Sequence, residues 1–240
     1  MKIYIGLILF FFLSCQNRQD KNLASNNNDT SQIKLTETIA TDTVQLEEVF
    51  IDSLTIGRKQ NNKVEVFKYR TADSNYVDIK FYTKQTDNWK LNQIIHFSKD
   101  GITGCDTKLS DFNNDGLNDM TIVSSVAARG ANEVRRLFIY NRSTDKLIEM
   151  KNSENYPNML YNKDLNCIDA FLVYGGSSTV FLKISGDSLK EFASVEAMDG
   201  FTVKEIDKNG KEKIIFQDTT NKAAYIRFKT YKPLKEYDEY

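Results

Sequence analysis

The chain has 240 residues and a formal net charge of −1, from 32 Lys and Arg against 33 Asp and Glu. This near-neutral balance, without a basic block, argues against nucleic acid as a partner and against electrostatic docking on anionic lipid. The sequence contains no H-E-x-x-H or G-x-S-x-G motif and no glycine-rich phosphate loop, and its single His, His96, rules out a zinc site built from several His. We therefore expect a protein that is not an enzyme. Because a glycosidase needs only two carboxylates, a hydrolase stays open as an alternative.

The N-terminus resembles the signal of a bacterial lipoprotein. Lys2 precedes an apolar run over residues 3–13, which is shorter than the roughly 20 residues that a membrane-spanning helix needs and is typical of a signal peptide. The run ends in Ser14 and Cys15, and a small residue followed by Cys resembles the lipobox that lipoprotein signal peptidase cleaves. The sequence thus predicts a signal peptide at residues 1–14 and a lipidated Cys15 that anchors the chain in a membrane. An ordinary secretory signal, or an uncleaved anchor, with an incidental Cys is the alternative.

The next segment has the composition of a tether. Residues 16–43 contain no aromatic side chain and include the polar run SNNNDTSQ. Such a stretch cannot bury enough apolar surface to fold, so we expect residues 15–43 to be a lipidated Cys and a disordered tether. Gln16, rather than Asp, follows the modified Cys, which by the usual sorting rule permits transport to the outer membrane. We expect an outer-membrane, lipid-anchored protein that faces either the periplasm or the cell surface.

From residue 44 onward the composition changes, with frequent Phe, Tyr, Ile and Val. Residues 44–240 are enough for one domain with a sizeable core. Apolar side chains recur at every second position in residues 77–82, 180–184 and 226–229, which is the period of half-buried strands, and turn-forming residues separate such segments. The pattern predicts a single all-β antiparallel domain, propeller-like or a sandwich. We expect its aromatic side chains in the core rather than on a sugar-binding platform.

The most informative motif, D-x-N-x-D-G-x-x-D, covers residues 111–119. Oxygen ligands at alternate positions can surround one hard cation, and the glycine permits the sharp turn. Position twelve is Ile122 rather than the Glu of an EF-hand, and a strand-like run follows, so the loop resembles the calcium loops of FG-GAP-type repeats. The expected cofactor is Ca²⁺, and a polar turn without metal is the alternative. The expected ligands are the side chains of Asp111, Asn113, Asp115 and Asp119 and the backbone carbonyl of Leu117.

A wider resemblance covers roughly residues 100–195. The calcium loop is followed by ARGAN at residues 128–132, RLFIYN at 136–141 and DKL at 145–147. This order resembles the periplasmic inhibitors of invertebrate-type lysozyme and related calcium-binding immunity lipoproteins. The resemblance implies a small propeller-like β domain that blocks a glycan hydrolase with a loop. Here the matching stretch has the Gly of the family's S-G-x-x-Y pattern but neither its Ser nor its Tyr. Its predicted contact residues are Arg129, Gly130, Ala131 and Asn132.

These features favour a calcium-binding envelope protein that binds and inhibits a peptidoglycan hydrolase. A strand over residues 120–126 is expected to lead from the calcium loop to a turn at 127–132, whose small residues fit a narrow cleft. Arg129 can pair bidentately with carboxylates, which glycan hydrolases carry in their catalytic cleft. A solvated turn residue is the alternative role for Arg129. The alternative function is a surface or periplasmic module that binds glycan or matrix.

Two cysteines remain after Cys15. An oxidising compartment and an even count favour a disulfide between Cys105 and Cys167, which would tie the segment before the calcium loop to a later strand. Two buried thiols that lie far apart are the alternative.

Overall fold

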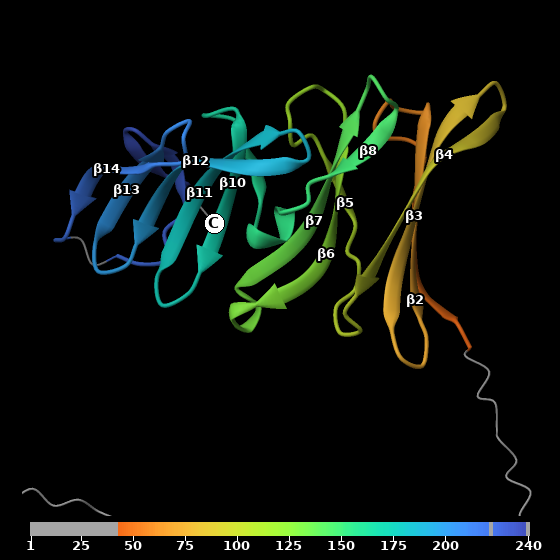
Figure 1. The fold of residues 1–240 in the computed structure, drawn as a ribbon, viewed down its shortest axis with the longest axis horizontal. Helices are drawn as coiled ribbons and strands as arrows, with labels where there is room; N and C mark the ends of the chain where they lie inside the picture. The colour runs from red at the N-terminus through yellow and green to blue at the C-terminus, as the bar shows by residue number, and fades with distance from the viewer. Residues whose placement is uncertain (1–42, 221–222, 239–240) are drawn as a thin grey trace, which may run out of the picture. The chain divides into compact units, whose positions relative to one another are not determined.

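The computed structural model of the protein describes residues 43–220 and 223–238 (Figure 1). The predicted signal peptide, the lipidation site Cys15 and all of the predicted tether except Thr43 lie outside these residues. Within them the secondary structure consists of β-strands and two short 3₁₀ helices, and the strands of every sheet pair antiparallel, so the prediction of an all-β antiparallel fold is confirmed. No helix in the described part of the chain is long and apolar enough to cross a membrane.

The first sheet is a four-stranded meander of neighbouring strands. Its strands are β1 (Gln45–Asp52), β2 (Asn62–Arg70), β3 (Asn75–Gln85) and β4 (Asn88–Lys99). Burial alternates residue by residue along β2, because successive side chains point to opposite faces of a strand. One face of this sheet is therefore covered by a hydrophobic core, and the other face points away from that core.

The second sheet has the same order of neighbours. It contains β5 (Lys108–Ser110), β6 (Asp119–Ala127), β7 (Asn132–Asn141) and β8 (Lys146–Glu149), with the 3₁₀ turn η1 (Ala128–Gly130) between β6 and β7. The strand expected over residues 120–126 is β6, and this prediction is confirmed. A second 3₁₀ turn, η2 (Ser153–Asn155), follows β8.

The third sheet has six strands in sequential order and is followed by a small hairpin. Its strands are β9 (Leu160–Asn162), β10 (Cys167–Val173), β11 (Ser177–Ser185), β12 (Ser188–Ala197), β13 (Phe201–Ile206) and β14 (Glu212–Asp218). The hairpin consists of β15 (Phe228–Tyr231) and β16 (Leu234–Glu236).

Three hydrophobic cores join these layers in chain order. The first core lies between the first and second sheets and contains Ile79 and Phe138, and the second lies between the second and third sheets and contains Leu137 and Ile168. The third core packs the third sheet against the hairpin through Phe181 and Phe228. Figure 1 shows the sheets following one another along the chain. The three cores thus pack consecutive antiparallel layers on one another.

Side-chain amides connect neighbouring sheets at their edges. Gln93 of β4 accepts a hydrogen bond from the backbone N–H of Leu147 (2.9 Å) and donates to its carbonyl (3.0 Å), which links the first sheet to the second. Asn152 forms the same pair of bonds with Leu189 of β12, at 2.8 Å each. A carboxamide can replace a missing strand partner because it carries both a donor and an acceptor. These pairs satisfy backbone groups where one sheet meets the next.

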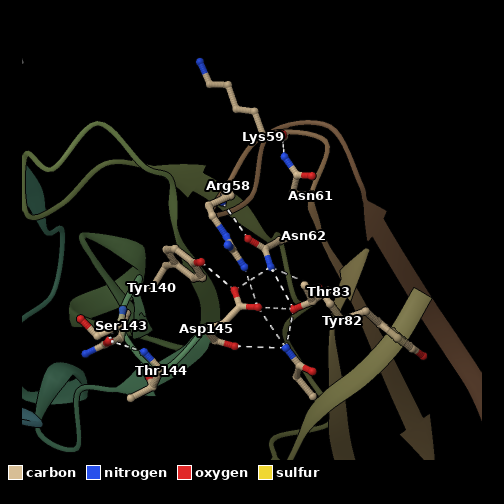
Figure 2. Close-up of polar contacts among 12 residues, drawn as sticks. Arg58, Lys59, Asn61, Asn62, Tyr82, Thr83, Tyr140, Ser143, Thr144 and Asp145 are labelled. Carbon is tan, nitrogen blue, oxygen red and sulfur yellow. Dashed lines mark hydrogen bonds and ion pairs between the residues drawn. The ribbon is translucent and has the colours of Figure 1, made fainter. Parts of the chain in front are cut away.

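Asp145 forms the polar junction between the first and second sheets. It lies in the turn between β7 and β8, and its carboxylate is surrounded by polar side chains from both sheets (Figure 2). They are Arg58, Asn62, Thr83, Asn92 and Tyr140. Burial opposes ionisation of Asp145, but the hydrogen bonds from its neighbours and the Arg58 guanidinium outweigh it and lower the pKa of this carboxyl. The ionised carboxylate therefore stabilises the packing of one sheet on the other.

A second buried ion pair holds the C-terminal hairpin on the third sheet. The side chains of Asp169 and Arg227 are 0% exposed, and Arg227 Nε donates to Asp169 Oδ1 at 2.7 Å. The other carboxylate oxygen accepts bonds from the hydroxyl of Tyr237 (2.6 Å) and the amide of Asn162 (2.8 Å). Such a charge is tolerated in a core only because several donors replace the lost water.

The disulfide predicted between Cys105 and Cys167 is wrong. Both cysteines are free thiols, and each is buried in a different core, Cys105 in the first and Cys167 in the third. Burial raises the pKa of the Cys105 thiol to about 11 and that of Cys167 to about 12, so both are packed as small apolar groups. The even count of cysteines carried no information about the distance between them.

Replacing Asp145 by Asn is expected to destabilise the domain by about 2 kcal/mol at pH 7, because Arg58 and several donors lose an ionised acceptor. The folded pKa of Asp145 lies below its usual 3.8, so the stabilisation is present above that value and is lost as the pH falls through the folded pKa. Denaturant unfolding of both proteins from pH 7 to pH 3 should therefore show the difference narrowing in acid. Asp187→Asn, which changes an exposed surface pair with Lys151, is the control. A difference that is constant with pH would contradict this role.

Candidate functional site

The predicted calcium loop, residues 111–119, follows β5 and ends at Asp119, the first residue of β6. Apolar side chains fix it on both sides. Phe112 is buried in the second core, and Leu117 packs against the first. The backbone N–H of Gly57, in the connection between β1 and β2, donates to the carbonyl of Asn118 at 3.0 Å. The loop therefore lies where the two cores meet and has little freedom to move as a whole.

The hydrogen bonds inside the loop bring alternate side chains together. Asp111 Oδ2 accepts from the N–H of Gly116 (2.8 Å), while Asp111 Oδ1 and Asn113 Oδ1 both accept from the N–H of Asp115 (3.2 and 3.1 Å). Asp115 Oδ1 in turn accepts from the N–H of Leu117 at 2.9 Å. Oxygens from residues 111, 113 and 115 thus gather around one turn, as the spacing of the motif predicts.

Two residues of the loop have left-handed backbone angles, Asn114 with φ +58° and Gly116 with φ +82°. Asn and Gly tolerate this region best, because Asn can bond locally and Gly has no Cβ. A Cβ at Gly116 would meet no atom within 4 Å, so the glycine is required by its backbone angle rather than by crowding.

Asp119 has a role that the sequence did not show. It is 0% exposed, and its two oxygens accept hydrogen bonds from the backbone N–H groups of Phe112 and Tyr140, each at 2.8 Å. Burial raises the pKa of Asp119 to about 7, with a further contribution from the charges of Asp115 and Asp111, although the two N–H donors oppose the shift. This carboxylate closes the base of the loop and connects it to β7.

The side chains of the loop carry the carboxylate and amide oxygens that a calcium site needs. Asp111 and Asn113 are partly exposed and Asp115 is exposed, so their side chains can reach an ion from solvent. The described residues contain no ready-made group of three acidic, Cys or His side chains around one point. Both oxygens of Asp119 already accept backbone bonds, although each carboxylate oxygen has a second lone pair. The loop is therefore a polar turn closed by its own hydrogen bonds. A cation could bind to it only after the ligand side chains rearranged.

The predicted contact loop lies at the opposite end of β6. This strand has 9 residues and so extends about 30 Å at ~3.3 Å per residue. At its end Ala128, Arg129 and Gly130 have φ values of +49°, +57° and +95°, and all three residues are exposed. Two consecutive non-glycine residues in this region store strain, which persists only where the flanking structure holds the turn.

We call residues 128–131 the tip. Two asparagines fix the base of the tip. Asn132 accepts a bond from the N–H of Val173 (2.8 Å) and donates to its carbonyl (2.9 Å), so this predicted contact residue joins the second sheet to the third. Asn158, which the sequence analysis missed, accepts from the N–H of Glu133 (3.1 Å) and donates to the carbonyl of Ala131 (2.9 Å). The structure brings Arg129, Gly130 and Ala131 together at the tip and assigns Asn132 to its base.

The comparisons with known proteins assign no family. No protein-family model and no curated protein matches the chain. Among solved structures, the chain is similar to a Xanthomonas protein described as related to a type IV secretion system, with 9% sequence identity and a TM-score of 0.42 over 74% of this chain and 95% of that chain. A likeness of this size carries no inference about function.

Two substitutions separate the roles within the loop. Asp119→Ala leaves two buried N–H groups without an acceptor, and at about 1–3 kcal/mol each this should lower the melting temperature by ~10 °C even in chelator. Asp111→Ala should cost less in chelator but should abolish any rise in melting temperature with calcium. That rise is expected to be ~5–10 °C for the wild type at about 100 times the dissociation constant.

Thermal melts of the wild type and both variants, in chelator and in CaCl₂, test this assignment, with MgCl₂ as the control for a non-specific divalent effect. Identical wild-type melts in chelator and calcium would count against the metal site. A wild-type-like melt of Asp119→Ala in chelator would instead contradict the structural role of that carboxylate.

Proposed function

We propose that this chain is a lipid-anchored, calcium-binding envelope protein that binds and inhibits a glycan hydrolase, in the first instance a peptidoglycan hydrolase. The observation that carries the proposal is the tip at residues 128–131, which is exposed at its apex and held at its base by Asn132 and Asn158. A turn of this kind can enter a partner's cleft without first being ordered, so less conformational entropy is lost on binding.

The chemistry of the tip suits a cleft lined by carboxylates. Arg129 is exposed at its apex, and a guanidinium forms paired hydrogen bonds with a carboxylate. The neighbours of Arg129 are two alanines and one glycine, so the backbone can approach a narrow site closely. Glycan hydrolases place two carboxylates on either side of the bond that they cleave, which gives an inserted arginine a target.

Calcium would act on the tip from a distance in this proposal. The loop at residues 111–119 and the tip are the two ends of β6, and Asp119 joins the loop to β7, the other strand that leads to the tip. A cation bound by Asp111, Asn113 and Asp115 would neutralise the facing carboxylates and stiffen the start of β6. It would not itself contact the partner.

The anchor completes the proposal. The lipidated Cys15 and the tether lie outside the described residues, and they are proposed from the lipobox-like sequence alone. They would hold the domain at the outer membrane, where peptidoglycan hydrolases have access to it.

A binding assay against purified peptidoglycan hydrolases tests the proposal, starting with any hydrolase encoded beside this gene. Arg129→Ala should weaken binding by at least ~2 kcal/mol, about 30-fold, because a buried interface arginine is a typical hot spot. Arg142→Ala, at an exposed position in the turn between β7 and β8, is the matched control and should bind like the wild type. If a hydrolase binds and its affinity falls with neither substitution, or with both, the contact lies elsewhere on the domain.

A further inference from the structure

Several turns at one edge of the domain carry exposed apolar side chains. Ile102, between β4 and β5, is 92% exposed, and Val126, at the end of β6, is 52% exposed. Tyr174, between β10 and β11, and Met198, between β12 and β13, are 42% and 47% exposed. Figure 1 shows the turns after β2, β6 and β10 at the lower edge of the view. We call this edge the rim, and it consists of residues 43–44, 71–74, 100–104, 126–131, 174–176 and 198–200.

The loop between β4 and β5 is fixed to the end of β6. Lys99 Nζ and the hydroxyl of Thr103 donate to the carbonyl of Ser124 at 3.2 and 3.4 Å. Asp100 Oδ1 accepts bonds from the backbone N–H groups of Ile102 and Thr103 at 3.1 and 2.8 Å. Ile102 therefore lies on a loop that is held in place, beside the strand that leads to the tip.

The rim continues from the tip to the third sheet. Asn132, at the base of the tip, exchanges two hydrogen bonds with Val173, the last residue of β10. Tyr174 follows directly, and the turn between β12 and β13 lies alongside, because Ser177 pairs with Ala197. The exposed apolar side chains thus follow one another along the rim rather than lying scattered over the surface.

The chain that carries the proposed anchor joins the domain at the rim. The register of the first sheet places the start of β1 in one row with the end of β2, the start of β3 and the end of β4. The first described residues, Thr43 and Val44, therefore lie beside the turn after β2 and the loop after β4, and Val44 is 54% exposed. Residues 16–42 separate this point from Cys15, the proposed lipidation site. The anchor thus attaches the domain to the membrane by its rim.

The rim carries few charges. Its exposed charged residues are Asp73, Arg129 and Asp199, and it contains no lysine. The carboxylate of Asp100 is occupied by its own loop and lies 3.6 Å from Lys99 Nζ. This surface has no basic patch for anionic lipid. Aliphatic and tyrosine side chains nevertheless favour the interface of a neutral bilayer, and the long side chain of an arginine can keep its charge at the headgroups.

The arrangement also differs from that of a protein interface. The centre of a protein interface is closely packed and matches its partner in shape. On the rim the apolar side chains stand on separate short turns, and a fluid bilayer can accommodate such turns without a complementary shape. Exposed apolar groups gathered at one edge of a domain mark an interaction site, and the point where the chain enters favours the membrane as the occupant.

We infer that the rim docks on the surface of the lipid bilayer in which the chain is anchored, with Ile102, Tyr174 and Met198 at the boundary between headgroups and acyl chains. This inference rests on the proposed lipidation of Cys15. The anchor keeps the effective concentration of lipid around the rim high, so a contact that would be weak for a free domain suffices.

Docking would regulate the proposed hydrolase contact. The tip belongs to the rim, so Arg129 faces the bilayer in the docked state and is accessible in the undocked state. A hydrolase would then compete with the membrane for the same turn, and its apparent affinity would fall with the fraction of undocked domain.

Fluorescence quenching in vesicles tests the docking. The full lipidated chain, with an environment-sensitive fluorophore on Ile102→Cys, is reconstituted in vesicles of phosphatidylcholine and phosphatidylethanolamine that contain lipids with a nitroxide on the acyl chain. Leu91→Cys, at an exposed position near the other end of β4, is the matched control. Quenching should be at least ~3-fold stronger at residue 102, because that label reaches the acyl boundary. Cys105 and Cys167 are buried and stay unlabelled.

A second reporter separates docking from an accidental contact of the label. With the fluorophore on Tyr174→Cys, the added substitution Ile102→Asp should lower quenching at residue 174 to the level of residue 91, because a carboxylate opposes insertion. Ile102 is exposed, so the melting temperature of Ile102→Asp should stay close to that of the wild type. None of these measurements needs the hydrolase, so failure of the docking is distinguishable from failure of the hydrolase contact.

Four outcomes would overturn the inference. The first is equal quenching at residues 102 and 91. The second is shielding of residue 102 from iodide in water without quenching by the nitroxide lipids, which would make the rim an interface between protein molecules. The third is quenching that appears only when anionic lipid is added. The fourth is a mass of the purified chain that shows no acyl group on Cys15, which would remove the anchor and leave the hydrolase contact to its own test.

Discussion

The buried carboxylate of Asp119 is the contact on which the arrangement of the site depends. A fully buried carboxylate is costly, and this one is retained because two backbone N–H groups, those of Phe112 and Tyr140, point at its oxygens. Through these bonds one side chain fixes the base of the loop, the start of β6 and the end of β7. As a result, Phe112 has a fixed position in the second core and Leu117 has a fixed position against the first core.

Elsewhere in the domain, buried polar groups are likewise satisfied by hydrogen bonds from a neighbouring sheet or strand. Where two sheets meet, the exposed backbone of one strand is satisfied by a carboxamide from the next layer, as in the pairs of Gln93 with Leu147 and of Asn132 with Val173. Where a charge is enclosed, several donors surround it, as at Asp145 and Asp169. The stack of sheets is thus held by apolar cores in its interior and by polar side chains at its margins. The tip uses the same device, because Asn132 and Asn158 allow strained residues to remain exposed at its apex.

The sequence predicted the features that depend on local spacing. Alternating apolar residues predicted the strands, and the motif at residues 111–119 predicted a turn around which Asp111, Asn113 and Asp115 gather. It could not predict that Asp119 bonds to Tyr140, because that partner is 21 residues away and is set by the register of β6 and β7. Asn132 and Asn158 look like ordinary polar loop residues until their partners in other sheets are known.

One expectation failed because composition gives no direction to a side chain. The cysteines were paired by their number, but they belong to different cores. The aromatic residues were expected in the core, where Phe81 and Phe138 lie, while Tyr69 and Tyr76 stack on each other, half-buried, on the opposite face of their strands. Only the parity of each residue along its strand, fixed by the observed register, separates the two sets.

Hydrogen–deuterium exchange of the full chain, in CaCl₂ and in chelator, tests most directly the claim that a metal-bound loop steadies the tip through β6. The account predicts that calcium slows exchange of the amides in residues 113–117 and that the protection extends along β6 to residues 128–131, with β11–β13 unchanged. Protection confined to the loop would contradict the coupling between the loop and the tip. Equal exchange of the loop in calcium and chelator would contradict the metal site itself.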